Sequence, residues 1–262
     1  LIFGDGGVTA VGANCFNMAV VMPFIGWGVY RLIARNSPVE SARRWIGAAV
    51  GGYVGLNASA LTTAIMFGIQ PLIATDAAGK ALYCPFGLKI AVPIMAAEHL
   101  LVFGFVEAAV TGLVVAYLQR VEPGLLRAAV QDGRSEIGKT PARRLALLIG
   151  LLILLSPLGL YLPAKFASDT AWGEWSSEEL ARIAGYVPSG LKQTEFVWTA
   201  PMPDYAAPGA GSAPLHVLSV HYILAAIVGI ALLVAVSYGL KTLFWRRGDE
   251  GNPAMDAPVN NG

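Results

Sequence analysis

The sequence has very little charge. Only 13% of its 262 residues are Asp, Glu, Lys or Arg, whereas 55% are hydrophobic and the mean hydropathy is +0.59. A soluble domain carries about twice that share of charged residues. The scarcity of charge therefore excludes an ordinary soluble domain and indicates an integral membrane protein. The 18 basic and 17 acidic residues nearly cancel, so the net charge gives no reason to expect a nucleic-acid partner.

Cysteine is also scarce. Cys15 and Cys84 are the only two cysteines, and they stand far apart in the chain. They indicate neither a disulfide framework nor a thiolate metal site, and we interpret them as small packing residues. The sequence opens with LIFGDGG, without an initiating methionine or the features of a signal peptide. We expect it to be part of a longer protein whose amino-terminal segment precedes Leu1.

Long apolar stretches are what the sequence has in abundance. A helix that crosses a bilayer needs about 20 mostly apolar residues. Five stretches are of about this length: 6–30, 45–69, 90–118, 145–162 and 217–240. The sequence therefore predicts an all-α fold, a polytopic transmembrane helical bundle with about five spans.

Basic residues gather in alternate connections between these spans. The ranges 31–44, 120–144 and 241–262 hold four, six and three Lys or Arg residues, whereas 163–216 holds three against six acidic residues. Because basic connections stay in the cytoplasm, we predict that 163–216 lies outside it. There, Ser176 or Ser177 is expected to begin a short helix with Glu178 and Glu179 in its first turn.

One connection contains a formal phosphate-loop match. Gly133 is followed, after four residues, by Gly138, Lys139 and Thr140. A phosphate loop needs a buried strand before it and a soluble α/β domain around it, but Pro141 and a membrane span follow at once. We interpret the match at 133–140 as fortuitous and predict that the chain is not an enzyme.

Several polar residues fall inside the predicted spans, where they are costly and often functional. His99 and Glu107 are eight residues apart and share a helical face with Phe103, while Glu98 lies on a neighbouring face. They could form a cation path, transmit movement from a partner, or hold the bundle together by hydrogen bonds.

The first span contains Asn14, Asn17 and Met18 within one turn. Their amide oxygens and thioether could line a cation entry or support nearby metal ligands; the alternative is hydrogen bonding and packing between helices. His216 and His221 are five residues apart, which does not place two imidazoles on one helix face. We interpret these histidines as an interfacial and a packing residue.

Four segments resemble the CbiM/NikM family, the substrate-capture (S) components of cobalt/nickel energy-coupling-factor ABC transporters. Three of them are similar to late spans of that family, in order, and the fourth is similar to the CbiN/NikN-like module fused behind it. They are LIFGDGGVTAVGANCFNMAVV, NASALTTAIMFGIQP, EHLLVFGFVEAAVTGLVVAYLQR and SSEELARIAGYVPSGLKQTEFVWTAPMPDYAAPG.

The resemblance implies a division of the chain into four parts. The first is the C-terminal part of a CbiM/NikM-like membrane domain with three spans, followed by a cytoplasmic linker. A CbiN/NikN-like module with two spans and an extracytoplasmic loop comes next, and a disordered tail ends the chain. The ranges are 1–120, 121–144, 145–245 with its loop at 163–216, and 246–262.

The resemblance also implies a function. The chain would help to import Co²⁺ or Ni²⁺ as transported substrate, with no cofactor bound by this part of the protein. Its partners would be a CbiQ/NikQ-like coupling subunit and a CbiO/NikO-like ATPase subunit, in the cytoplasmic (inner) membrane of a prokaryote. The alternatives are a secondary cation carrier or channel that uses Glu98, His99 and Glu107, and a membrane scaffold without transport.

The metal ligands themselves are not expected in this sequence. In the family, the terminal amine, a nearby backbone nitrogen and two imidazoles bind the metal, and the segments that carry them are absent here. Ligands are therefore expected in the missing amino-terminal part of the protein. Asn14, Asn17, His99 and Glu107 remain candidates for supporting those ligands or lining the ion's path.

Overall fold

A computed structural model describes residues 2–3, 8–128, 142–161, 177–194, 197–211 and 213–249, and the named elements within these ranges are all helical. Four helices are long and apolar enough to cross a membrane: Val11–Ala34, Ala42–Ile73, Leu88–Val121 and Leu215–Leu243. A fifth apolar helix, Ile149–Tyr161, is shorter. The predicted all-α transmembrane bundle is confirmed, although the span expected at 145–162 is present as this shorter helix.

The first span contains a wide helical turn. It begins with η1 (Val8–Ala10) and α1 (Val11–Phe16), passes through a π-helical turn, η2 (Asn17–Val21), and continues as α2 (Met22–Ala34). In η2 the backbone N–H of Met22 bonds to the carbonyl of Asn17, five residues back. Turns of this kind occur mostly as single insertions in α-helices, frequently at functional sites.

The second span, α3 (Ala42–Gly68), begins at a side-chain cap. The Oγ of Ser41 accepts a hydrogen bond from the backbone N–H of Arg43 at 3.3 Å. Glycines let α3 approach α2 closely, because a Cβ added to Gly51 would lie 2.6 Å from the carbonyl oxygen of Gly26. Close backbone approach through small residues is how membrane helices pack without a hydrophobic driving force.

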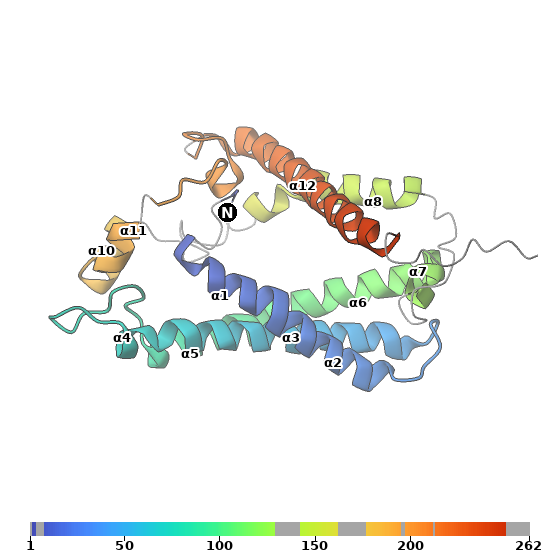
Figure 1. The fold of residues 1–262 in the computed structure, drawn as a ribbon, viewed down its shortest axis with the longest axis horizontal. Coiled ribbons are helices and arrows are strands. Elements are labelled where there is room, and N and C mark those ends of the chain that lie inside the picture. Colours follow the sequence, from blue (N-terminus) through green and yellow to red (C-terminus); the bar gives the residue numbers. More distant parts are fainter. Residues whose placement is uncertain are drawn as a thin grey trace, which may run out of the picture.

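The third span packs on the other side of α3. It is made of α5 (Leu88–Glu98), the π-helical turn η3 (His99–Phe103) and α6 (Gly104–Val121), and α7 (Pro123–Ala128) follows it. Gly104 and Gly112 are its buried residues in α6. Thus α3 is the central helix of the three (Figure 1), and both π-helical turns contact it.

The two ends of the bundle differ in character. At one end, called here the basic end, the connection 35–41 meets the C-terminal part of α6, where Gln119 Nε2 donates to the carbonyl of Ser41 at 2.9 Å. At the other, called the hairpin end, the chain passes through α4 (Gln70–Ile73) and a turn closed by a bridge between Thr75 and Ala81. The basic and hairpin connections lie at opposite ends of the three spans (Figure 1).

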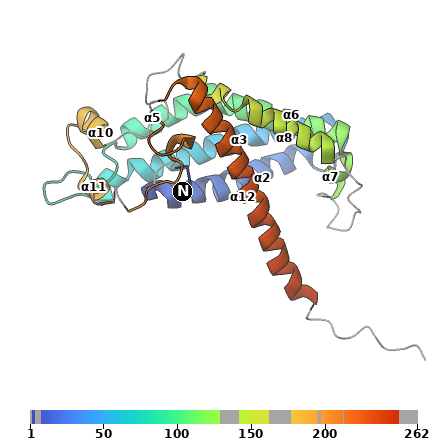
Figure 2. The ribbon, with the colours of Figure 1, turned by 90° about the horizontal axis from the view of Figure 1, so that it is seen from above.

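The C-terminal part contains α8 (Ala142–Leu155), α10 (Ser177–Ala184), α11 (Ser189–Thr194), η4 (Pro203–Tyr205) and α12 (Leu215–Asp249). Ser177, Glu178 and Glu179 form the first turn of α10, as the sequence predicts. The helix α12 packs on α8 and then departs from the bundle (Figure 2). It continues to Asp249, through the first four residues of the range 246–262 for which the sequence predicts disorder.

The segment between α8 and α12 docks on the hairpin end. The backbone N–H of Gly190 in α11 donates to the carbonyl of Leu82 at 2.8 Å, and Lys80 Nζ lies 5.2 Å from the ring centre of Tyr186. Further on, the N–H of Met202 donates to the carbonyl of Ile2 at 3.0 Å. The C-terminal module therefore contacts both the hairpin and the first described residues of the chain.

We expect Gly190→Ala to loosen this docking. A Cβ at this position would lie 2.6 Å from the carbonyl oxygen of Leu82 and 2.6 Å from Cε1 of Tyr83, so α11 must move off the hairpin. An overpacked contact costs about 1–3 kcal/mol, which corresponds to an increase in local opening of about 5- to 150-fold. Proteolysis within 177–194 measures this opening.

Gly211→Ala is the matched control, because no atom lies within 4 Å of a Cβ built there. Equal cleavage rates in the two variants would show that the Gly190–Leu82 contact does not hold the segment in place.

Candidate functional site

Asn17 is the most deeply buried polar residue in the described part of the chain, with 1% of its surface exposed. It opens the π-helical turn η2, and its Nδ2 donates to Thr63 Oγ1 at 2.8 Å and to Met66 Sδ at 3.4 Å. Both acceptors lie on α3, near the hairpin end. These contacts form the Asn17 cluster, defined here as Asn17, Thr63 and Met66.

The Asn17 cluster leaves one polar atom without a partner. Thr63 Oγ1 donates to the carbonyl of Ser59 at 2.9 Å, so it can only accept from Asn17, and this fixes which end of the amide faces it. The other end, Asn17 Oδ1, is buried and has no hydrogen-bond partner among the described residues. Leaving such an oxygen unsatisfied costs about 1–3 kcal/mol. The atom is thus ready to accept an N–H group or to contact a cation.

The neighbouring residues of the first span do not join this cluster. The side chain of Asn14 is half-buried and that of Met18 is 66% exposed. Neither forms a hydrogen bond with Asn17 among the described side chains. Of the Asn14–Asn17 pair named from the sequence, only Asn17 lies within the helix interface, and Asn14 stays a prediction.

A second polar group joins α3 to the other π-helical turn. Tyr53 Oη donates to the carbonyl of Leu100 in η3 at 3.0 Å, and Asn57 Nδ2 donates to the carbonyl of Tyr53 at 2.8 Å. A Cβ at Gly104 would lie 2.6 Å from Asn57 Nδ2. The glycine therefore lets the buried amide of Asn57 sit directly against α6.

His99 and Glu107 find partners on their own helix. His99 Nδ1 donates to the carbonyl of Met95 at 2.9 Å, and its ring lies 5.6 Å from that of Phe103. Glu107 Oε1 accepts from Thr111 Oγ1 at 2.7 Å. The structure confirms the proximity of His99 to Phe103 but shows no direct contact between His99 and Glu107. Their local hydrogen bonds favour a structural role over a continuous relay.

The other titratable residues considered from the sequence are Glu98, His216 and His221. Glu98 and His216 are exposed, while His221 Nδ1 is buried and has no partner in the described part of the chain. Within the described ranges, no three His, Cys, Asp or Glu side chains come together in a way that could hold a metal ion. The Asn17 cluster is therefore the best-formed candidate for handling a cation.

Sequence reasoning missed the residues of α3. Tyr53, Asn57, Thr63 and Met66 were not among the candidates, because the range 45–69 was judged by its lack of charge and its small residues. A signal was present in the stretch NASALTT, since amides and hydroxyls within a charge-free span need partners on neighbouring helices.

Cys84, beyond the spans at the hairpin end, offers a test of this region's burial. Burial raises the pKa of its thiol, and the hydrogen bond from Sγ to the carbonyl of Phe86 partly offsets that rise. Maleimides react with the thiolate. We therefore expect Cys84 to be labelled more slowly than an unfolded thiol near pH 8, and the difference to shrink as the pH rises through the raised pKa.

The measurement uses a Cys15→Ser background, so that only Cys84 reacts, and compares native with denatured protein across pH. Equal rates at every pH would contradict the burial of this thiol.

Two family models match the chain in consecutive ranges. Residues 1–125 match the family described as "Cobalt uptake substrate-specific transmembrane region", CbiM, and residues 142–246 match the PDGLE domain. The first range covers the three packed spans with the Asn17 cluster. The second covers the module that docks on the hairpin end.

Named relatives share both parts. The chain is 42% identical to the fused nickel transport protein NikMN of Rhodobacter capsulatus, covering 95% of this chain and 73% of that protein. It is 40% identical to the "probable fused nickel transport protein LarMN" of Lactiplantibacillus plantarum, covering 92% of this chain and 68% of that protein.

A solved structure of a transition metal transporter also matches, at 49% identity and a TM-score of 0.44, over 51% of this chain and 58% of that chain. The match therefore spans little more than half of the solved protein. The identity to the fused relatives, over nearly the whole of the chain, agrees with the order of the two family models. This chain belongs to the CbiM/NikM family of metal transport proteins, in the form that carries a fused CbiN-like PDGLE module.

Proposed function

We propose that the chain is part of the membrane-embedded substrate-binding component of an energy-coupling-factor ABC transporter that imports Ni²⁺ or Co²⁺. The observation that carries the proposal is the 42% identity to a fused nickel transport protein over 95% of the chain. The family model for cobalt uptake over residues 1–125 supports the same substrate class.

The geometry supports a capture role at the hairpin end. The Asn17 cluster lies toward this end, and α11 of the module docks there through the hydrogen bond from Gly190 to Leu82. With basic connections in the cytoplasm, this end faces the outside, where an imported ion arrives. Asn17 Oδ1 would accept a hydrogen bond from the segment that holds the metal, or contact the ion as it enters.

ATP hydrolysis, in this proposal, takes place on a separate ATPase subunit, with a separate coupling subunit between the two. The phosphate-loop match at 133–140 lies outside the described residues. The described part of the chain contains no sheet that could aim such a loop. Lys139→Ala is therefore expected to leave ATP-driven uptake unchanged, as measured in vesicles that contain all subunits. Loss of uptake, with the subunits still assembled, would assign nucleotide binding to this chain.

The proposed function is tested by reconstitution. The complete protein is placed in vesicles with its coupling and ATPase subunits, and uptake of radioactive Ni²⁺ and Co²⁺ is measured with and without ATP. We expect uptake only when ATP and both partners are present. A matched sample contains an ATPase subunit that cannot hydrolyse ATP.

Two other outcomes would overturn the proposal. Uptake that persists without ATP or partners would identify a secondary carrier. Glu98, His99 and Glu107 would then be the candidate relay residues. Absence of Ni²⁺ and Co²⁺ uptake in every sample, with assembly verified, would indicate a scaffold.

A further inference from the structure

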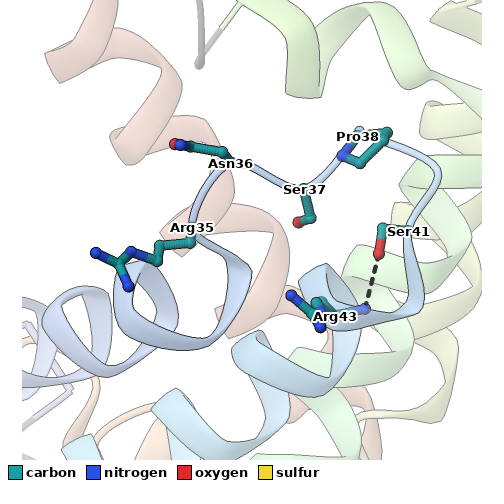
Figure 3. A pocket seen from close by; sticks show the side chains of 6 residues that line it. All are labelled: Arg35, Asn36, Ser37, Pro38, Ser41 and Arg43. Atoms are coloured by element: carbon teal, nitrogen blue, oxygen red, sulfur yellow. Dashed lines mark hydrogen bonds between the residues drawn. The ribbon is translucent and has the colours of Figure 1, made fainter.

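The connection between α2 and α3 forms a hollow at the basic end. Its volume is about 440 Å³, within the range of pockets that hold small ligands. The side chains around it come from the first residue after α2, the rest of the connection and the first turn of α3 (Figure 3). They are Arg35, Asn36, Ser37, Pro38, Ser41 and Arg43.

Three helices hold the wall of this hollow in place. Arg44, only 6% exposed, donates to the carbonyl of Ser37 at 2.6 Å, to that of Pro38 at 3.1 Å and to Tyr30 Oη on α2 at 2.8 Å. Gln119 on α6 donates to the carbonyls of Val39 and Ser41. These hydrogen bonds occupy backbone acceptors of the connection.

The lining has the chemistry of an anion site. Arg35 and Arg43 are exposed, and neither forms an ion pair within the described part of the chain. Ser37 Oγ is buried and lacks a hydrogen-bond partner among the described residues, so it can donate into the site. Two guanidinium groups and a hydroxyl suit a phosphate group, which accepts several charge-assisted hydrogen bonds. Glu40, in the same connection, is not part of the lining.

The backbone at Arg35 is a separate indication. This residue has φ 35° and ψ −129°, a conformation that favours glycine, yet the position carries arginine. Strained backbone of this kind persists where the surroundings enforce it and is concentrated at ligand sites. An arginine at a position suited to glycine indicates that its side chain contributes to a ligand site.

The position of the hollow along the helices indicates which kind of molecule carries the bound phosphate. Trp27 on α2 and Trp45 on α3 are 56% and 40% exposed, and the guanidinium of Arg31 stacks 4.7 Å above the Trp27 ring. Exposed tryptophans sit at the level of lipid headgroups, and basic pockets between membrane helices bind anionic headgroups. We propose that this hollow binds the phosphate of an anionic phospholipid.

Native mass spectrometry of the complete protein in a neutral detergent tests the proposal, with phosphatidylglycerol as probe and phosphatidylcholine as reference. We expect one phosphatidylglycerol to bind in preference. Arg35→Gln and Arg43→Gln should each weaken it about fivefold, as expected for one basic group near an anionic headgroup. Ser37→Ala should weaken binding without any change of charge. Arg31→Gln is the matched control, because it removes the same charge outside the hollow.

Arg35→Gly can be tested even if the other variants fold poorly, because glycine accepts this backbone conformation. It should fold as stably as the parent, judged by its thermal unfolding, and still bind phosphatidylglycerol about fivefold more weakly. If Arg31→Gln weakens phosphatidylglycerol as much as Arg35→Gln does, the attraction is diffuse and the site is overturned. If millimolar inorganic phosphate displaces the lipid, the hollow is a site for soluble anions and the lipid assignment fails.

Discussion

Asn17→Ala in the complete protein is expected to lower its affinity for Ni²⁺ by about 10–100-fold, the loss seen when a residue that orients metal ligands is removed. The physical reason is the buried Oδ1, which has no partner among the described residues and lies at the end where the ion is proposed to enter. Isothermal titration with Ni²⁺ measures the effect.

The structural cost of Asn17→Ala should be much smaller. A hydrogen bond between membrane helices contributes about 0.6 kcal/mol on average, so losing the contacts to Thr63 and Met66 leaves the bundle folded. A folded variant that binds Ni²⁺ as tightly as the parent would remove Asn17 from the functional residues.

Two threonines of α3 provide a matched comparison. Thr63 accepts the hydrogen bond of Asn17, whereas Thr62 bonds only to the carbonyl of Ala58 in its own helix. Thr63→Val should free the amide of Asn17 to rotate and weaken Ni²⁺ binding by about tenfold. Thr62→Val should have no such effect. Equal affinities in the two variants would mean that the orientation of Asn17 does not matter for binding.

Gly51→Leu is expected to destabilise the bundle by about 3 kcal/mol, at the upper end of overpacking costs. The first added carbon would lie 2.6 Å from the carbonyl oxygen of Gly26. Because that oxygen belongs to the backbone of α2, the whole helix must move away. Thermal unfolding in detergent, followed by circular dichroism, should show a clear fall in the midpoint.

Gly28→Leu is the control for Gly51→Leu. Gly28 lies on α2, and nothing lies within 4 Å of a Cβ built there. The unfolding midpoint of Gly28→Leu should therefore stay close to that of the parent. A similar fall in both variants would mean that the loss arises from glycine replacement in general and not from the contact between α2 and α3.

The helix α10 shows what local sequence determines. Ser176 or Ser177 was expected to begin a short helix with Glu178 and Glu179 in its first turn, and α10 begins at Ser177 with both glutamates in that turn. Such signals are read correctly because a cap and its first turn involve neighbouring residues only. The range 145–162 was predicted as one span, but α8 ends at Leu155, and hydropathy does not register the break that follows.

The candidate site was predicted only in part. Asn17 was named from its residue type inside a span, but Thr63 and Met66 were not, since they are 46 and 49 residues away in the chain. His99 and Glu107 were placed on one helical face, yet each bonds to its own helix. The π-helical turns at Asn17 and His99 were not anticipated, and they alter which side chains face α3.

The sequence by itself determined that this protein is a helical membrane protein with alternating basic connections, and its motifs indicated the family. Those properties follow from length, apolarity and charge, which are summed along the chain. Only the tertiary structure decided that Asn17 faces Thr63, that Arg44 builds the hollow at the basic end and that Gly190 docks on Leu82. Each depends on how helices rotate and approach one another, and local patterns do not encode those angles and distances.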